Sequence, residues 1–93
     1  MKLLEIILLR TSGHCDQQAR KYIRKFCRIV KKYNLSEANF YVHASIPGDL
    51  ALVISSQAQE GKDKGTVWGI YMAGVLKQFG LVDYNCWLLE DYE

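Results

Sequence analysis

The sequence lacks the features that mark a secreted, a membrane-spanning or a disordered protein. Its 93 residues hold one proline and three cysteines, none in CxxC spacing, so we expect no disulfide framework and place the reduced thiols in the cytoplasm. Glu5 breaks the apolar opening, and Arg10 stands where a signal peptide would have a small-residue cleavage site. No apolar run is long enough to span a bilayer, and we expect no membrane partner.

An excess of charge of one sign is also missing. The formal net charge is +2, which is too small to indicate a nucleic-acid partner by itself. The histidines and cysteines show no zinc-ligand spacing, so we expect no metal site. The length indicates one domain, residues 1–93, near the size at which a core is barely sufficient, and a homodimer would supply the missing burial.

The sequence is rich in apolar surface in its second half. The segment Thr66–Phe79 predicts a helix in which only Lys77 and Gln78 are clearly hydrophilic. A surface helix needs one apolar stripe, whereas a helix without a polar side must be covered on most sides. The strand predicted at Leu81–Leu89 is apolar on both faces too. In so short a chain, this pattern indicates that a second subunit or a ligand covers part of the surface.

The remaining elements complete a β-α-β-β-α-β order. Pro47 and Gly48 predict a hairpin turn, and Asn34 predicts a left-handed residue after the first helix. The two halves align at an offset of 46 residues, as expected of a split βαβ repeat. The sequence therefore predicts an α+β, ferredoxin-like domain with a four-stranded antiparallel sheet. Hydrophobic periodicity gives its other segments as a strand at Leu3–Leu9, a helix at Asp16–Tyr33, strands at Phe40–Ile46 and Leu50–Ser56, and a polar loop from Ser56 to Lys64.

Side-chain alternation sorts these strands into two sheet faces, with Ile46 paired to Leu50 across the turn. The face under the helices would carry Leu4, Ile6, Leu8, Val42, Ala44, Ile46, Leu50, Leu52, Ile54, Tyr84, Cys86 and Leu88. The opposite, open face would carry Leu3, Glu5, Ile7, Leu9, Tyr41, His43, Ser45, Ala51, Val53, Ser55, Asp83, Asn85, Trp87 and Leu89. Such an apolar patch is unusually large for a surface in water, and the same face of another copy is the simplest cover.

The element order, the length and the two-sided strands resemble the dimeric α/β-barrel superfamily of ferredoxin-like domains, which includes the antibiotic biosynthesis monooxygenase-like proteins. The resemblance covers the whole chain and carries no residue signature. It implies a homodimer in which two four-stranded sheets meet face to face, with the helices outside. Members include cofactor-free oxygenases that place Asn, Trp, Tyr and His side chains around a polyaromatic substrate. The resemblance thus implies an aromatic ligand oriented by Asn85 and Trp87 beside Tyr41, a proton accepted by His43, and no cofactor.

Two further sets of residues are candidates for a site. Glu5 and His43 are ionisable residues on the predicted open face, where either could act as an acid or a base, or form a structural pair. Trp68 and Tyr71, with other aromatic residues, could line a pocket for a flat ligand between the sheet and the helices. Plain packing of the core and the interface is the favoured alternative. The residues leave open whether the protein is an enzyme.

The rival interpretation is a non-enzymatic interaction module. One side of the first helix is basic, and it could dock an acidic protein or RNA. A solvated outer face is the favoured interpretation, because the motif of ferredoxin-like RNA binders is absent. The cations concerned are Arg20, Lys21, Arg24, Lys25, Arg28, Lys31 and Lys32.

Overall fold

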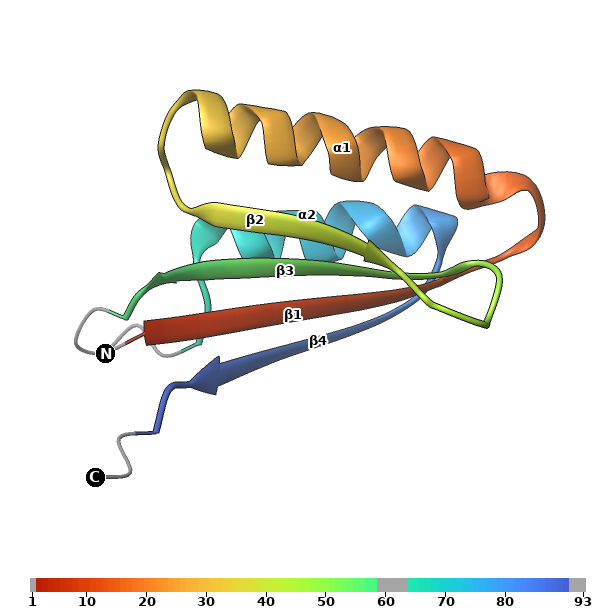
Figure 1. The fold of residues 1–93 in the computed structure, drawn as a ribbon. Helices are drawn as coiled ribbons and strands as arrows, with labels where there is room; N and C mark the ends of the chain where they lie inside the picture. Colours follow the sequence, from red (N-terminus) through yellow and green to blue (C-terminus); the bar gives the residue numbers. More distant parts are fainter. Residues whose placement is uncertain (1, 59–63, 91–93) are drawn as a thin grey trace.

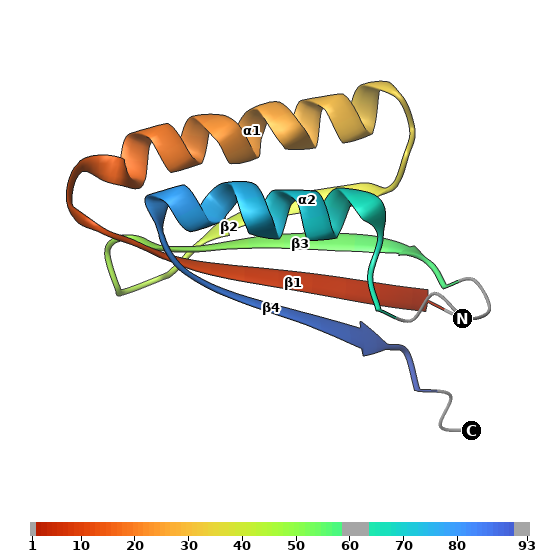
Figure 2. The same cartoon turned by 180° about the vertical axis from the view of Figure 1, so that it is seen from behind.

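The computed structural model describes residues 2–58 and 64–90, and it has the predicted β-α-β-β-α-β order (Figure 1). The four strands form one antiparallel sheet in the order β2-β3-β1-β4. Both helices cover the same face of this sheet, and none of the described residues covers the other face (Figures 1 and 2). The elements are β1 (Lys2–Thr11), a 3-10 turn (Gly13–Cys15), α1 (Asp16–Lys32), β2 (Glu37–Val42), β3 (Asp49–Gln57), α2 (Val67–Leu76), a second 3-10 turn (Lys77–Phe79) and β4 (Gly80–Leu88).

The core lies between the sheet and the helical layer. Ala19, Ile23 and Val30 of α1 recur at helical spacing and are buried, as amphipathic periodicity predicts. α1 ends as expected: Asn34 has a φ of 52°, and the N–H of Leu35 donates to the Val30 carbonyl at 3.1 Å. From α2 and the turn that follows it, Met72, Leu76 and Phe79 complete the core.

The predicted hairpin has the wrong register. β2 ends at Val42 rather than Ile46, and Val42 is the residue that pairs with Leu50. Residues 43–48 therefore form a longer connection, in which Nδ1 of His43 accepts the N–H groups of Ser45 and Ile46 at 3.0 and 2.9 Å. The difference in register is four residues, an even number, so the side chains of β2 still point to the predicted faces.

The predicted faces are confirmed for β3 and β4 and wrong for β1. Leu50 and Leu52 of β3 lie under the helices, as expected. In β1, however, Glu5 and Ile7 are buried on the helix side, together with Leu3 and Leu9. The open face instead carries Leu4, Ile6 and Leu8, which pair with Ser55, Val53 and Ala51 of β3. β1 is apolar on both sides, so its alternation alone did not identify the face that the helices cover.

One predicted segment lies partly outside the described residues. Of the polar loop from Ser56 to Lys64, the structure gives β3 continuing to Gln57, and residues 59–63 are not described. Within the described part of the chain, no helix is long and apolar enough to cross a membrane. The second helix is shorter than the predicted Thr66–Phe79, because α2 ends at Leu76 and a 3-10 turn follows it up to Phe79.

Candidate functional site

Glu5, the first of the predicted acid–base residues, is fully buried beneath the start of α2. Its Oε1 accepts the N–H of Thr66 at 2.7 Å and the hydroxyl of Tyr84 at 2.5 Å, and its Oε2 accepts the hydroxyl of Thr66 at 2.8 Å. The Thr66 hydroxyl also accepts the N–H of Gly69 at 3.1 Å and thereby caps the helix. A carboxyl group at a helix N-terminus is favoured by the helix dipole. Three donors in this position explain why a charged side chain faces the core.

The surroundings of Glu5 leave no room for a substrate. A Cβ atom at Gly69 would lie 2.7 Å from Cδ of Glu5, and one at Gly65 would lie 2.9 Å from its Oε1. Burial, followed by the hydrogen bond to Glu5, raises the pKa of Tyr84 above its usual range, so its hydroxyl remains a donor at neutral pH. This cluster of Glu5, Thr66, Tyr84 and the two glycines joins α2 to the sheet. The prediction that Glu5 lies on the open face is wrong.

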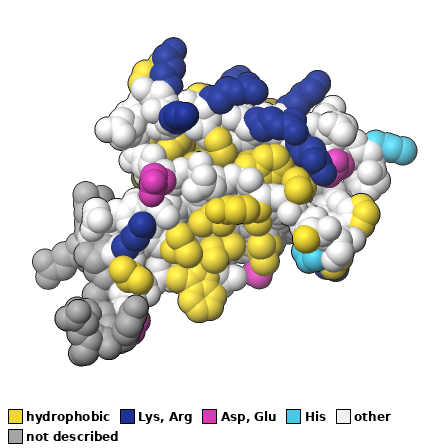
Figure 3. Space-filling view, viewed as in Figure 1, with side chains coloured by type: hydrophobic (Ala, Val, Ile, Leu, Met, Phe, Trp, Pro, Cys, Tyr) yellow, Lys and Arg dark blue, Asp and Glu magenta, His cyan; other side chains and the backbone are white. Residues whose placement is uncertain are grey.

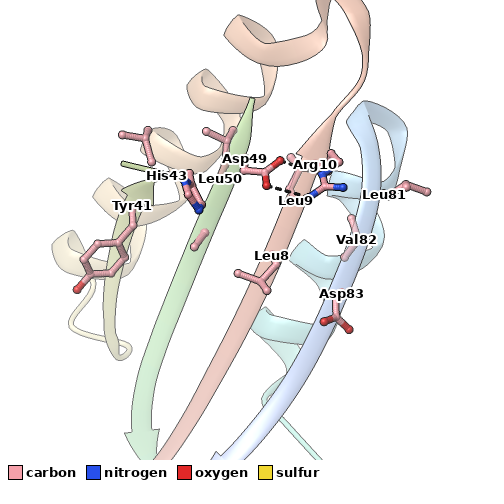
Figure 4. A pocket seen from close by; sticks show the side chains of 12 residues that line it. Leu8, Leu9, Arg10, Tyr41, His43, Asp49, Leu50, Leu81, Val82 and Asp83 are labelled. Carbon is pink, nitrogen blue, oxygen red and sulfur yellow. Dashed lines mark hydrogen bonds and ion pairs between the residues drawn. The ribbon is translucent and has the colours of Figure 1, made fainter. Parts of the chain in front are cut away.

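The open face carries a hollow of about 390 Å³ near the β2–β3 connection. Tyr41 and His43 stand on one side of it, Leu81 and Asp83 on the other, and Leu8 forms part of the floor (Figure 4). Most of the lining side chains are apolar, with a few polar groups at the rim. Apolar walls with a small number of polar groups are typical of sites for small organic ligands.

His43 lies at the rim of this hollow with one ring nitrogen already engaged. Because Nδ1 accepts two backbone N–H groups, a neutral ring carries its proton on Nε2. Taking up a second proton would place it on Nδ1 and would break both hydrogen bonds of the turn. In this geometry His43 suits the role of a hydrogen-bond donor better than that of the proton acceptor predicted for it.

An ion pair that was not predicted closes the same rim. Nε of Arg10 lies 3.1 Å from Oδ1 of Asp49, and Nη2 of Arg10 lies 3.1 Å from Oδ2 of Asp49 (Figure 4). The hydrogen bond from Arg10 lowers the pKa of Asp49, which is therefore a weak base. β1 and β3 place the two residues opposite one another. Their opposite charges are visible in the sequence, but only the β1–β3 register identifies them as partners.

The predicted ligand-binding residues fall into two groups. Tyr41, Asn85 and Trp87 lie on the open face, where Tyr41 lines the hollow and the other two stand further along β4. Trp68 and Tyr71 belong to α2, are exposed, and do not line the hollow. A second hollow, of about 960 Å³, lies between the start of α2, the end of α1 and the sheet, and Trp68 lines it while Tyr71 does not. The aromatic ligand expected beside Trp68 and Tyr71 stays a prediction. No group of three His, Cys, Asp or Glu side chains suited to a metal ion occurs among residues 2–58 and 64–90.

The topology and the one-sided helical layer define a ferredoxin-like α+β domain, and solved structures place it more narrowly. The match with the Rv0793 protein of Mycobacterium tuberculosis covers 99% of this chain and 98% of that protein's chain, with a TM-score of 0.75 and 11% sequence identity. SnoaB of Streptomyces nogalater, a cofactor-independent oxygenase solved as a mutant, matches 98% and 95% with a TM-score of 0.70 at 3% identity. An antibiotic biosynthesis monooxygenase matches 98% and 99% with a TM-score of 0.67 at 10% identity.

The chain therefore shares the ferredoxin-like fold of these proteins, as the resemblance in the sequence implied. No family model and no curated protein matches the sequence. At such low identities the likeness establishes the architecture. The chemistry must be argued from the residues of this chain.

Proposed function

We propose that this protein is a cytoplasmic homodimer that joins the open faces of two sheets and binds a flat aromatic molecule in the hollow beside Tyr41 and His43. The observation that carries the proposal is the exposure of large apolar side chains on the open face that holds this hollow. Leu81 is 76% exposed, Trp87 58% and Tyr41 54%. Free cysteines fit the reducing compartment.

The case for a dimer rests on the apolar surface that a single chain leaves exposed. The open face carries Leu4, Ile6, Leu8, Val53, Leu81 and Trp87. Hydrophobic side chains gather over the strands, below the Lys and Arg side chains of α1 (Figure 3). An identical face is self-complementary around a twofold axis, so one copy can cover the other with the same residues. Joining the sheets would also turn the open hollow into an enclosed one.

The case for an aromatic ligand rests on the lining of the hollow. Tyr41 offers a ring face, Leu8 and Leu81 offer apolar contact, and the rim offers donors from Arg10 and His43. Aromatic rings gain from stacking on other rings, and the N–H donors at the rim favour a ligand that carries an oxygen acceptor such as a carbonyl group.

Oxidation of such a ligand is a further step that the geometry supports less well than binding. A cofactor-free oxidation needs a base to take a proton from the substrate. Nδ1 of His43 already accepts two backbone N–H groups, and Asp49 is held by Arg10. We therefore propose binding as the primary function, with any oxidation depending on a base from the second copy or from the ligand itself.

The dimer is tested with the two tryptophans, which lie on opposite sides of the molecule. Trp87→Lys places a charge on the open face and should raise the dimer dissociation constant by about 30-fold or more. The matched control, Trp68→Lys on α2, should remain a dimer in native mass spectrometry. Leu8→Lys gives a second open-face variant, and circular dichroism verifies that each variant is folded. A monomeric native protein, or a fully dimeric Trp87→Lys variant, would disprove the interface.

The ligand site is tested with two tyrosines of similar exposure. Anilinonaphthalene sulfonate, a flat aromatic anion, is titrated and its fluorescence followed. Tyr41→Ala should weaken binding about tenfold because a stacking surface is lost. The control Tyr71→Ala on α2 should bind like the native protein. Equal binding by the Tyr41→Ala variant would place the dye elsewhere and refute the site.

A further inference from the structure

A dimer through the open face leaves a second apolar surface uncovered on the opposite side of the molecule. Sequence patterning indicates that α2 must be covered on most sides, and the sheet covers only one of them. Val67, Ile70 and Tyr71 point outward from α2 and are 76%, 54% and 65% exposed. No charged residue occurs within α2. One homodimer interface therefore does not account for all the exposed apolar surface of this chain.

The neighbouring helix α1 concentrates the positive charge of the protein. It carries seven Lys and Arg residues against Asp16, a formal charge of +6, so the rest of the chain carries −4 to give the total of +2. Within the described residues, Arg20 pairs with Asp16 at 2.8 Å, and no other cation of α1 forms an ion pair. Helical spacing gathers these cations on one side of α1, and Figure 3 shows them as a row along the top of the molecule.

The two surfaces belong to one layer. α1 and α2 lie side by side over the same face of the sheet (Figures 1 and 2). Tyr22 of α1 contacts the ring of Phe79 at 5.4 Å between centroids, which connects the helices. Tyr22, Ile29 and Tyr33 are partly exposed. On the helical projection they fall between the cations and the core, on the side where Tyr22 meets Phe79. A row of cations, a seam of aromatic and aliphatic side chains, and an uncharged apolar helix thus follow one another across the outer surface.

We propose that this helical layer binds the surface of an anionic membrane without crossing it. Cations attract anionic headgroups, while Tyr, Ile and Val side chains beside them enter the boundary between headgroups and acyl chains. A 17-residue helix is about 25 Å long, so its cations span several lipid headgroups. The expectation of no membrane partner was based on the lack of a spanning segment, and a surface contact requires none.

The exposed apolar residues favour a membrane over the polyanions considered for α1. RNA would be held through its phosphates and through stacking on aromatic rings, and it gives no reason for Val67 and Ile70 to be exposed. An acidic protein would need an apolar patch of matching shape, whereas a lipid surface adapts to any arrangement. The proposal does not rest on the homodimer, because a monomer presents the same layer.

The test is flotation of the purified protein with lipid vesicles. Vesicles of phosphatidylcholine with about 30% phosphatidylglycerol should carry the protein at low salt, and pure phosphatidylcholine vesicles should not. Arg24→Gln combined with Arg28→Gln should lower the partition coefficient by roughly 30-fold. The matched control, Lys2→Gln combined with Lys64→Gln, removes two exposed cations elsewhere and should bind like the native protein.

A second pair of variants tests the apolar part. Ile70→Ser should weaken binding to the anionic vesicles several-fold, and Ile46→Ser, at an exposed isoleucine in the β2–β3 connection, should not. Trp68 lies in the same layer, and its fluorescence should shift to shorter wavelength on binding. Absence of flotation, equal flotation of the double arginine variant, or stronger binding to single-stranded RNA or polyglutamate than to vesicles would each overturn the proposal. None of these readouts depends on the dimer or on the aromatic ligand.

Discussion

The two faces of the sheet each carry a carboxyl group, and the two are held in opposite ways. Glu5, on the helix-covered face, is fully buried, lacks a cationic partner among the described residues, and accepts three hydrogen bonds from neutral donors. Asp49, on the open face, lies at the surface and pairs with the exposed Arg10. The first arrangement is part of the core, and the second is part of a rim.

The comparison shows that burial, rather than opposite charge, decides how much a polar contact contributes to the stability of the fold. Removing a buried acceptor leaves its donors without partners and without water, whereas an exposed ion pair is replaced by solvent. The covered face should therefore be intolerant of change and the open face tolerant. The predictions below test that contrast, beginning with the largest effect.

Glu5→Ala should be the most destabilising of these substitutions. The substitution removes the acceptor of three donors, the N–H and hydroxyl of Thr66 and the hydroxyl of Tyr84, and it leaves a cavity. We expect a loss of about 3–5 kcal/mol in the free energy of unfolding, measured by urea denaturation. For a domain of this size, such a loss brings the native state close to unfolding.

Two variants show whether the loss comes from the contacts of Glu5. Glu5→Gln keeps the size and one acceptor oxygen, so it should lose less than Glu5→Ala. Glu37→Ala removes an exposed carboxyl group at the start of β2 and should change stability by no more than about 0.5 kcal/mol. Similar stabilities for Glu5→Ala and Glu37→Ala would show that the buried hydrogen bonds contribute nothing.

The two glycines of α2 give a matched pair with effects of opposite sign. A Cβ at Gly69 would lie 2.7 Å from Cδ of Glu5, so Gly69→Ala must displace the carboxyl group and should destabilise by about 2–3 kcal/mol. A Cβ at Gly74 meets nothing within 4 Å, so Gly74→Ala should stabilise by up to about 1 kcal/mol through helix propensity. Thermal denaturation of both variants measures the difference. A stabilising Gly69→Ala would mean that Glu5 does not press against α2.

The sequence was sufficient for the topology because each element has a strong local signal. The periodicity of α1, the glycine-bounded α2 and the two-sided strands all lead to the same β-α-β-β-α-β order. The fold could also be recognised, since length, order and two-sided strands are properties of the whole chain. The register of the hairpin was less accessible, because it depends on the hydrogen bonds that His43 accepts within residues 43–48.

The candidate site was predicted in part. Tyr41, Asn85 and Trp87 do lie on the open face, since the alternation in β2 and β4 is clear. Glu5 was placed wrongly because β1 is apolar on both sides and the one charged residue of the predicted strand Leu3–Leu9 was assumed to face outward. That assumption fails where α2 and Tyr84 supply donors, and these come from residues 61 and 79 positions along the chain. Contacts of such separation have no local signature.

Substitution of Asp49 should have the smallest effect of the series. Arg10 lowers the pKa of Asp49 in the folded protein, so the pair stabilises the fold above the unfolded carboxyl pKa of about 3.9. That contribution is lost as the pH falls through the lower, folded pKa. The melting temperatures of the native protein and Asp49→Asn should therefore differ slightly near neutral pH and converge in acid. High salt should reduce the difference, because an exposed pair is screened. A gap that widens in acid, or a loss at neutral pH as large as that of Glu5→Ala, would contradict the contrast between the two faces.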